Sequence, residues 1–170
     1  MLSALVPRDS IPESAARKRV ARPAWVLGLI LALLACGGER PGSAGEFDDG
    51  WIKIGDQQIA LEIVRTPDEQ RLGLGNRDSL DWGNGMLFQY DKAIFPKFWM
   101  KDMRFDIDIL WIRDGRIVEI SNQVPHVPGQ NGPTVSPRIL ADSVLEVPAG
   151  FAQANRLHPG QIVKLEIFGE

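Results

Sequence analysis

Cysteine, histidine and familiar catalytic motifs are scarce in this chain of 170 residues. Cys36 is the single cysteine, so no internal disulfide bond can form. The two histidines, His126 and His158, lie too far apart for the ligand spacing typical of a metal site. The sequence also has no zinc, haem or phosphate-loop motif, and no Gly-x-Ser-x-Gly turn that could carry a serine nucleophile. We therefore predict no metal and no cofactor.

The apolar run at residues 24–35 is too short to cross a bilayer comfortably, because a membrane-spanning helix needs about 20 residues. Basic residues at positions 17–19 and 22 precede this run, which is the layout of a secretory signal. The segment Leu33-Leu34-Ala35-Cys36-Gly37 resembles a bacterial lipobox, which is cut before the cysteine. We predict a signal peptide over residues 1–35, acylation of Cys36, and an exported lipoprotein held on a membrane and facing the periplasm or the cell exterior.

Two alternatives to this lipoprotein prediction are an uncleaved anchor and an ordinary signal with a coincidental cysteine. Gly37 follows the cysteine where an aspartate would favour retention at the inner membrane. By analogy with known lipoprotein sorting, this glycine favours the outer membrane if the host has one.

An excess of positive charge is also missing. The chain has 19 Lys and Arg against 22 Asp and Glu, and the predicted signal peptide carries five of the former and two of the latter. The mature chain would therefore hold 14 cations and 20 anions, a formal net charge of −6. Since a nucleic-acid partner requires a basic surface, we predict none.

Beyond the signal, residues 36–50 consist mainly of glycine, serine and acidic residues. Such a segment cannot bury enough apolar surface to fold, so we predict a flexible tether. Residues 51–170 are enough for one domain, and we predict a single globular unit there.

Local patterns in the first half of that domain predict short strands and one helix. Apolar and polar residues alternate over 51–63, which indicates a hairpin with one buried face. Thr66, Pro67 and Glu69 are placed for a capping box that starts a helix, and Gly73 ends it. Residues 75–85 are predicted as a loop and residues 85–90 as the next strand.

A central hairpin is predicted over residues 107–120. The strand 107–113 is apolar on both parities, which is typical of a strand covered on both faces. Asp114-Gly115 suits a tight turn and residues 116–120 return. The irregular segment 122–142 is expected to be functional or mobile. A strand at 144–147, a helical turn within 149–157 and a last strand at 162–168 follow, in which Val163, Leu165 and Ile167 point inward. The expected fold is mainly β, a small β-barrel or sandwich of about eight strands with one or two short helices.

Ionisable and aromatic residues gather beside this central strand. The candidate functional cluster contains Trp99, Lys101, Asp102, Asp106, Asp108 and Glu146. A buried charge needs a partner, so we predict that Lys101 pairs with Glu146 or Asp108 at the mouth of a pocket. The plainer interpretation is a strand end with solvated charges. An aromatic platform for a sugar or peptide could combine Trp82, Trp99 and Trp111, although Trp111 is also a good core residue.

Four ordered motifs carry a family resemblance that covers about residues 51–168. They are residues 71–74 with Arg77, 85–88, 98–101 with 107–110 and 115–118, and 144–150. With these motifs the chain resembles the bacterial and archaeal family called domain of unknown function 192, which implies a compact, mostly β fold but no settled activity. The chain departs from the family pattern at Asp102, where Asn is usual, and at Asp106, where Pro is usual.

Three functions remain open at this point. The favoured one is a non-catalytic binding or interaction module for an envelope glycan, peptide or protein, since no nucleophile–base pair is recognisable. The second is a hydrolase or lyase acting on an envelope glycan through two carboxylates drawn from Asp102, Asp106, Asp108 and Glu146. The third is a structural or assembly role in which the charged residues stabilise the fold.

Overall fold

A computed structural model describes residues 47–169 of the chain. The predicted signal peptide, Cys36 and the tether up to residue 46 lie outside the described residues. The described part is mainly β, with nine strands and two short helices, which confirms the predicted fold class. In chain order these elements are β1 (Gly50–Ile54), β2 (Gln57–Val64), α1 (Pro67–Leu72), β3 (Asn84–Ile94), β4 (Phe98–Trp99), β5 (Ile107–Arg113), β6 (Arg116–Val124), β7 (Thr134–Val135), β8 (Ala141–Pro148), α2 (Phe151–Ala154) and β9 (Val163–Ile167).

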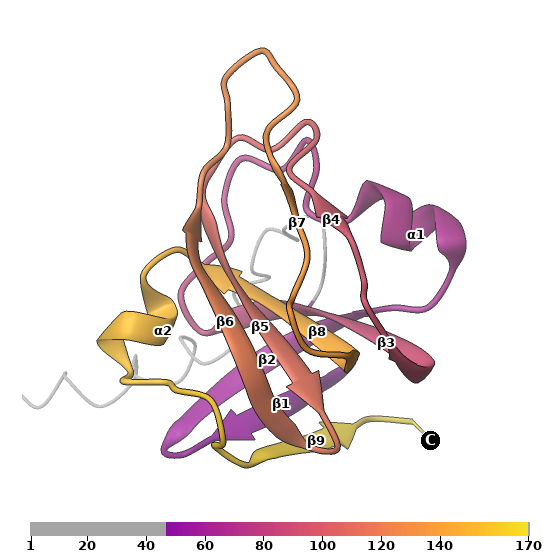
Figure 1. The fold of residues 1–170 in the computed structure, drawn as a ribbon, viewed down its shortest axis with the longest axis vertical. Helices are drawn as coiled ribbons and strands as arrows, with labels where there is room; N and C mark the ends of the chain where they lie inside the picture. Colours follow the sequence, from indigo (N-terminus) through magenta and orange to yellow (C-terminus); the bar gives the residue numbers. More distant parts are fainter. Residues whose placement is uncertain (1–46, 170) are drawn as a thin grey trace, which may run out of the picture. The chain divides into compact units, whose positions relative to one another are not determined.

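Seven of these strands form one sheet in the order β6-β5-β8-β3-β2-β1-β9, while β4 and β7 pair separately (Figure 1). Neighbours in the large sheet are antiparallel except β2 and β3, which are parallel and are joined through α1. The sheet curls into a half-barrel, because an isolated bridge between Arg116 and Ile162 links the start of β6 to the segment before β9.

Each face of the sheet buries its own apolar cluster. The inner cluster contains residues from the two edge strands of the sheet, Ile117 of β6 and Val163 of β9. Phe151 of α2 also belongs to it. The outer cluster lies on the opposite face and includes Phe98 of β4, Leu74 from the segment after α1 and Met100 from the loop after β4. In β5, Leu110 belongs to the inner cluster and Trp111 to the outer one, so this strand is covered on both faces as predicted.

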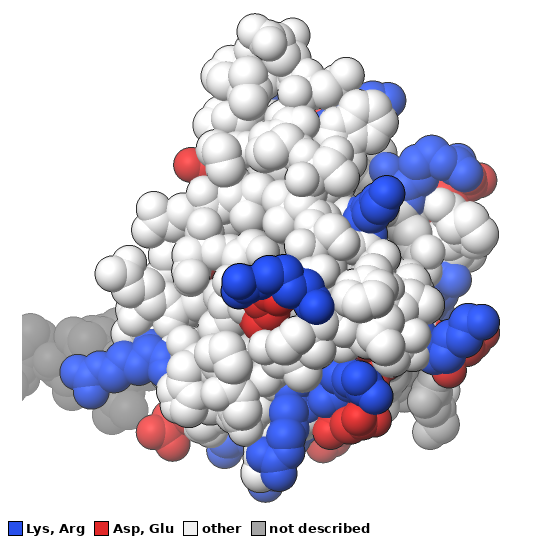
Figure 2. Space-filling model, viewed as in Figure 1, with Lys and Arg blue, Asp and Glu red and all other residues white. Residues whose placement is uncertain are grey.

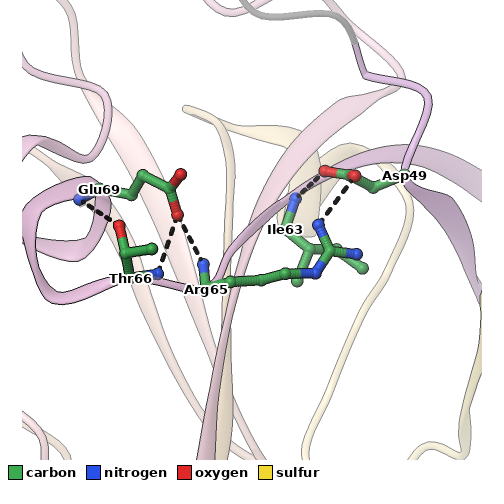
Figure 3. Close-up of polar contacts among 5 residues, drawn as sticks. All are labelled: Asp49, Ile63, Arg65, Thr66 and Glu69. Atoms are coloured by element: carbon green, nitrogen blue, oxygen red, sulfur yellow. Dashed lines mark hydrogen bonds and ion pairs between the residues drawn. The ribbon is translucent and has the colours of Figure 1, made fainter.

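The local signals at α1 and at the central turn are confirmed. The Thr66 hydroxyl accepts from the N–H of Glu69 at 3.2 Å, and Glu69 accepts from the N–H of Thr66 at 2.8 Å, so the capping box forms (Figure 3). The two backbone bonds from Arg65 and Thr66 and the Thr66 hydroxyl together lower the pKa of Glu69. Asp114 and Gly115 both have positive φ, at 50° and 67°, which is the requirement of a tight primed turn.

The ordered chain begins before Trp51, so the predicted tether includes residues that belong to the fold. Gly50 is part of β1, and a Cβ at this position would lie 2.2 Å from the carbonyl oxygen of Glu166. Asp49 binds β2 through a 2.7 Å bond from the N–H of Ile63 and through an ion pair with Arg65 (Figure 3). Burial alone would raise the pKa of Asp49, but these two partners lower it below its ordinary value.

Two other predictions need correction. Leu165 was expected to point inward, but it is 39% exposed because β9 is an outer strand of the sheet. The segment 122–142 is less irregular than predicted, since β6 continues to Val124, β7 follows within the segment, and β8 begins at Ala141. The middle of this segment projects at the top of the view in Figure 1.

Candidate functional site

Two acidic residues in the described part of the chain are buried, and they lie on neighbouring strands. Asp108 on β5 is opposite Val147 of β8, and Glu146 of β8 is opposite Ile109. Because successive side chains of a strand alternate between faces, the two carboxylates point to opposite sides of the sheet. Asp108 lies on the face of the inner cluster and Glu146 on the face of the outer cluster.

Both oxygens of Asp108 are used by the fold. Oδ1 accepts from the N–H of Gln123 at 2.7 Å, and Oδ2 accepts from the N–H of Ala152 at 2.8 Å. Gln123 has a positive φ of 48° at an irregularity in the pairing of β5 with β6. Asp108 therefore holds this part of β6 and the first turn of α2 against β5, which is a structural role.

Glu146 has no comparable support. Its Oε2 is buried and has no hydrogen-bond partner among the described residues. Burial raises the pKa of Glu146 to about 8, although the nearby charge of Arg77 acts in the opposite direction. The side chain is therefore a neutral carboxylic acid at pH 7.

Arg77 and Glu62 form a second polar group on the same face. The guanidinium of Arg77 donates two bonds of 2.7 Å to the two oxygens of Glu62, and both side chains are largely buried. Glu62 of β2 is opposite Met86 of β3, which is opposite Glu146 of β8, so the two acids are separated by one strand in a row across the sheet. Burial, followed by the charge of Glu146, raises the pKa of Tyr90 on β3.

An open groove lies elsewhere, along the free side of β6. Two adjoining depressions of about 510 Å³ each share Val118, Ile139 and Pro159. The first also contains Glu119, Ile120, Asn122, Arg138, Leu157 and His158, and the second also contains Arg113, Asp114, Arg116, Ile117 and Gly160. We call the two together the β6 groove. Arg138 crosses toward Glu119, whose oxygens accept from its backbone N–H at 2.8 Å and from its Nε at 3.3 Å.

The profile of domain of unknown function 192 (DUF192), described as "Uncharacterized ACR", matches residues 50–165. The chain belongs to the DUF192 family. The match covers the whole sheet except the last residues of β9. The family resemblance expected from the sequence motifs is thus confirmed.

Two solved structures are similar to this DUF192 chain over 68% of its length. One is a protein of unknown function from Novosphingobium aromaticivorans DSM 12444, with 26% identity, 83% of that chain covered and a TM-score of 0.61. The other is a candidate transcription regulator from Sinorhizobium meliloti 1021, with 25% identity, 91% of that chain covered and a TM-score of 0.60. A search of curated proteins finds no match.

The DUF192 fold does not bring Lys101 to Glu146 or Asp108, so that predicted pairing is wrong. The Lys101 side chain is 54% exposed and its Nζ lies 3.8 Å from a carboxylate oxygen of Asp102. The same ammonium is 5.8 Å from the centre of the Trp99 ring. These three residues lie at the surface beside β4, whereas the two buried acids sit within the sheet.

Asp106 lies apart from both the Lys101 group and the two buried acids, and it contacts His126. Its Oδ1 accepts from the backbone N–H of His126 at 2.9 Å and lies 2.6 Å from Nδ1 of the same histidine. These two contacts, the side-chain one first, lower the pKa of Asp106. The pair fixes the start of the projecting segment between β6 and β7. The predicted six-residue cluster is therefore divided among separate places in the fold.

The three candidate platform tryptophans are also separated. Trp111 is fully buried, donates from Nε1 to the hydroxyl of Ser121 at 3.0 Å and packs edge-on against Phe98, so it cannot be part of a surface platform. Trp82 is exposed and tilts over Phe151 of α2 with ring centres 5.0 Å apart. Trp99 is exposed on β4, and no ring contact joins it to Trp82 among the described residues.

Sequence reasoning missed Glu62 and Arg77 as neighbours of Glu146. Glu62 alternates with Leu61 and Ile63, so the pattern indicated only a solvent-facing position. The position of Arg77 in a family motif was the one available signal. Recognising the row required the register of β2 on β3, which depends on the return path through α1.

Within residues 47–169, no three His, Cys, Asp or Glu side chains are grouped so that they could hold a metal ion. Over the same residues, no helix has the length and apolar character needed to cross a bilayer. The face shown in Figure 2 is largely uncharged toward its upper end, and its Lys, Arg, Asp and Glu side chains gather lower down and to the right.

Proposed function

We propose that this DUF192 chain is an exported lipoprotein whose β domain is a non-catalytic binding module for an envelope partner, and that the β6 groove is its binding surface. The observation that supports this most directly is the groove itself. Its two depressions of about 510 Å³ combine apolar walls with a few polar groups, which is the usual composition of a ligand site.

The positions of the acids favour binding over catalysis. Glycoside hydrolysis by paired carboxylates needs two acids that face a common substrate. Asp108 and Glu146 point to opposite faces of the sheet, and both oxygens of Asp108 are already bonded. Asp102 and Asp106 lie near the surface with Lys101 and His126 as their respective partners. This distribution supports the binding hypothesis over the hydrolase or lyase hypothesis.

The anchor is supported by the sequence alone, through the basic residues, the short apolar run and the lipobox-like segment ending at Cys36. Growth of expressing cells with an alkyne fatty acid tests it, because acylated chain can then be detected by azide coupling. We expect the wild-type protein to carry the label and the Cys36→Ser variant to carry none. Equal labelling of the two, or none of the wild type, would contradict the anchor.

Binding is tested with full-length protein in detergent against glycans, peptidoglycan fragments and peptides from envelope proteins. We expect saturable binding that falls at least tenfold in Ile139→Asp, since Ile139 lines both depressions. Leu72→Asp on α1 is the matched control, because Leu72 is also exposed but lies outside the groove. Turnover of any of these compounds, or equal binding by the two variants, would count against the proposal.

A further inference from the structure

We infer that the β6 groove takes an extended, acidic polypeptide segment that adds to the free side of β6 as a further strand. The inference rests on the proposed function and names the ligand for the same surface. It follows from the free backbone edge, from the apolar walls and from the charge of the groove.

On the side away from β5, only the start of β6 is paired within residues 47–169, with residues 160–162 before β9. The N–H of Ile117 donates to the carbonyl of Gln161 at 3.0 Å, and the N–H of Gly160 donates to the carbonyl of Ile117 at 2.8 Å. An antiparallel bridge between Arg116 and Ile162 completes this contact. Past Ile117, β6 has β5 as its one strand partner in the described chain, and no backbone–backbone bond joins residues 118–122 to a described loop. The N–H of Arg138 bonds to the side chain of Glu119 and leaves the backbone of β6 unpaired there. An outer strand leaves alternate N–H and C=O groups unpaired, and an extended peptide can satisfy them.

The walls of the groove suit the side chains of such a peptide. Ile139, which is 46% exposed, lines the groove together with Leu157 and Pro159. Val118 and Ile120 of β6 also line it. These apolar surfaces can receive the apolar side chains of an added strand, which recur at every second residue.

The charge of the groove differs from that of the rest of the domain. Residues 47–169 carry 13 Lys and Arg against 17 Asp and Glu, yet three arginines and two acids line the groove. Arg138 neutralises Glu119 while its own side chain remains 89% exposed, so its charge is available to a ligand. Arg113 pairs with Asp114 at 3.4 Å, and Arg116, which donates to the carbonyl of Gly160 at 3.0 Å, supplies the net positive charge of this edge. Complementarity therefore favours acidic residues in the bound segment.

The test uses acetylated, amidated seven-residue peptides in which Glu alternates with Val, Leu or Tyr, and a matched set with Lys in place of Glu. Fluorescence anisotropy with full-length protein should show binding of the Glu peptides at least tenfold tighter than of the Lys peptides. N-methylation of one set of alternate backbone nitrogens should weaken binding at least tenfold, while methylation of the other set changes it less than threefold. This asymmetry is expected because a strand added to an edge donates through every second N–H.

Arg138→Glu should weaken binding of the Glu peptides at least tenfold and strengthen that of the Lys peptides. Arg71→Glu is the control, since Arg71 on α1 is also exposed and ion-paired but lies outside the groove. Far-ultraviolet circular dichroism would verify that both variants are folded. Equal binding of the two peptide sets, or equal effects of the two methylation patterns, would overturn the inference.

The outcomes also separate the inference from the function on which it rests. If no peptide binds while a glycan binds and loses affinity in Ile139→Asp, the peptide inference fails and the binding function stands. If neither peptides nor glycans bind, both fail.

Discussion

Asp108 and Glu146 differ sharply in what surrounds their carboxylates, although they lie on hydrogen-bonded strands and are both buried. On the inner face, Asp108 meets the N–H of Gln123 at a distorted part of β6 and the N–H of Ala152 at the start of α2. On the outer face, Oε2 of Glu146 meets no donor from any described residue. The comparison shows that two buried acids on neighbouring strands can have different roles: Asp108 bonds two backbone donors and so holds the fold together, whereas Glu146 lacks such donors among the described residues and burial raises its pKa.

The largest expected effect on stability is at Asp108, and the same acid-to-amide substitution at Glu146 provides the comparison. Asp108→Asn should lower the free energy of unfolding by roughly 3 kcal/mol, because one of two buried N–H groups then faces an amide N–H₂ in place of an oxygen. Glu146→Gln should change it by less than about 1 kcal/mol at pH 4, where the native side chain is neutral in both the folded and the unfolded chain. Urea unfolding followed by tryptophan fluorescence measures both, and equal costs would remove the distinction between the two sites.

The pH dependence of stability sharpens the comparison. The pKa of Glu146 rises from 4.5 to about 8 in the folded chain, so the folded state holds the extra proton between these values. Its contribution to stability is therefore complete below pH 4.5 and declines as pH rises toward 8, by up to about 1.4 kcal/mol per pH unit. Glu146→Gln should abolish this decline between pH 5 and 8 in urea titrations. A wild-type slope that persists in the variant would assign it to other groups.

Arg77 interacts with both outer-face acids, Glu62 through an ion pair and Glu146 through its charge. Arg77→Met should cost roughly 2 kcal/mol because it leaves Glu62 largely buried without its partner. It should also raise the pKa of Glu146 further, since the charge of Arg77 opposes the effect of burial. The carboxyl carbon of Glu146 in a ¹³C-labelled sample reports this pKa directly. An unchanged titration would show that Arg77 and Glu146 are not coupled.

The smallest effect is expected at Lys101. Lys101→Ala should lower the free energy of unfolding by at most about 1 kcal/mol, because its ion pair with Asp102 spans 3.8 Å and both side chains are about half exposed. Glu119→Ala, which removes the groove acid that binds Arg138, offers a comparison with a less exposed carboxylate. If Lys101→Ala lowered the free energy of unfolding by several kcal/mol, the result would support the predicted buried pairing of Lys101 and contradict the structure.

The features that were predictable from the sequence depend on residues close together in the chain. The capping box needs only Thr66 and Glu69, and the central turn needs only Asp114 and Gly115. The apolar residues on both parities of β5 likewise identified a strand covered on both faces. In each case one short segment contains all the atoms that make the interaction.

The features that were missed depend on register between distant segments. The row from Glu62 through Met86 to Glu146 joins three strands, one of them through a parallel pairing. The predicted link from Lys101 to Glu146 failed for the same reason, because parity within a strand gives a face but does not identify the neighbour across it. The β6 groove combines loops near residues 139 and 158 with an outer strand, and no local pattern brings these segments together.

The pairing of β1 with β9 places the first and last strands of the sheet side by side. The segment just before β9 also bonds to the start of β6. Neither contact can form until β9 has left the ribosome, so the curl of the sheet closes only after the segment up to Ile167 has been synthesised. Until then the inner face of a nascent chain stays open on two sides, and a chain shortened before Val163 would keep it open permanently. Folding of this domain is accordingly expected to be slow for its size, because its closing contacts join segments far apart in sequence.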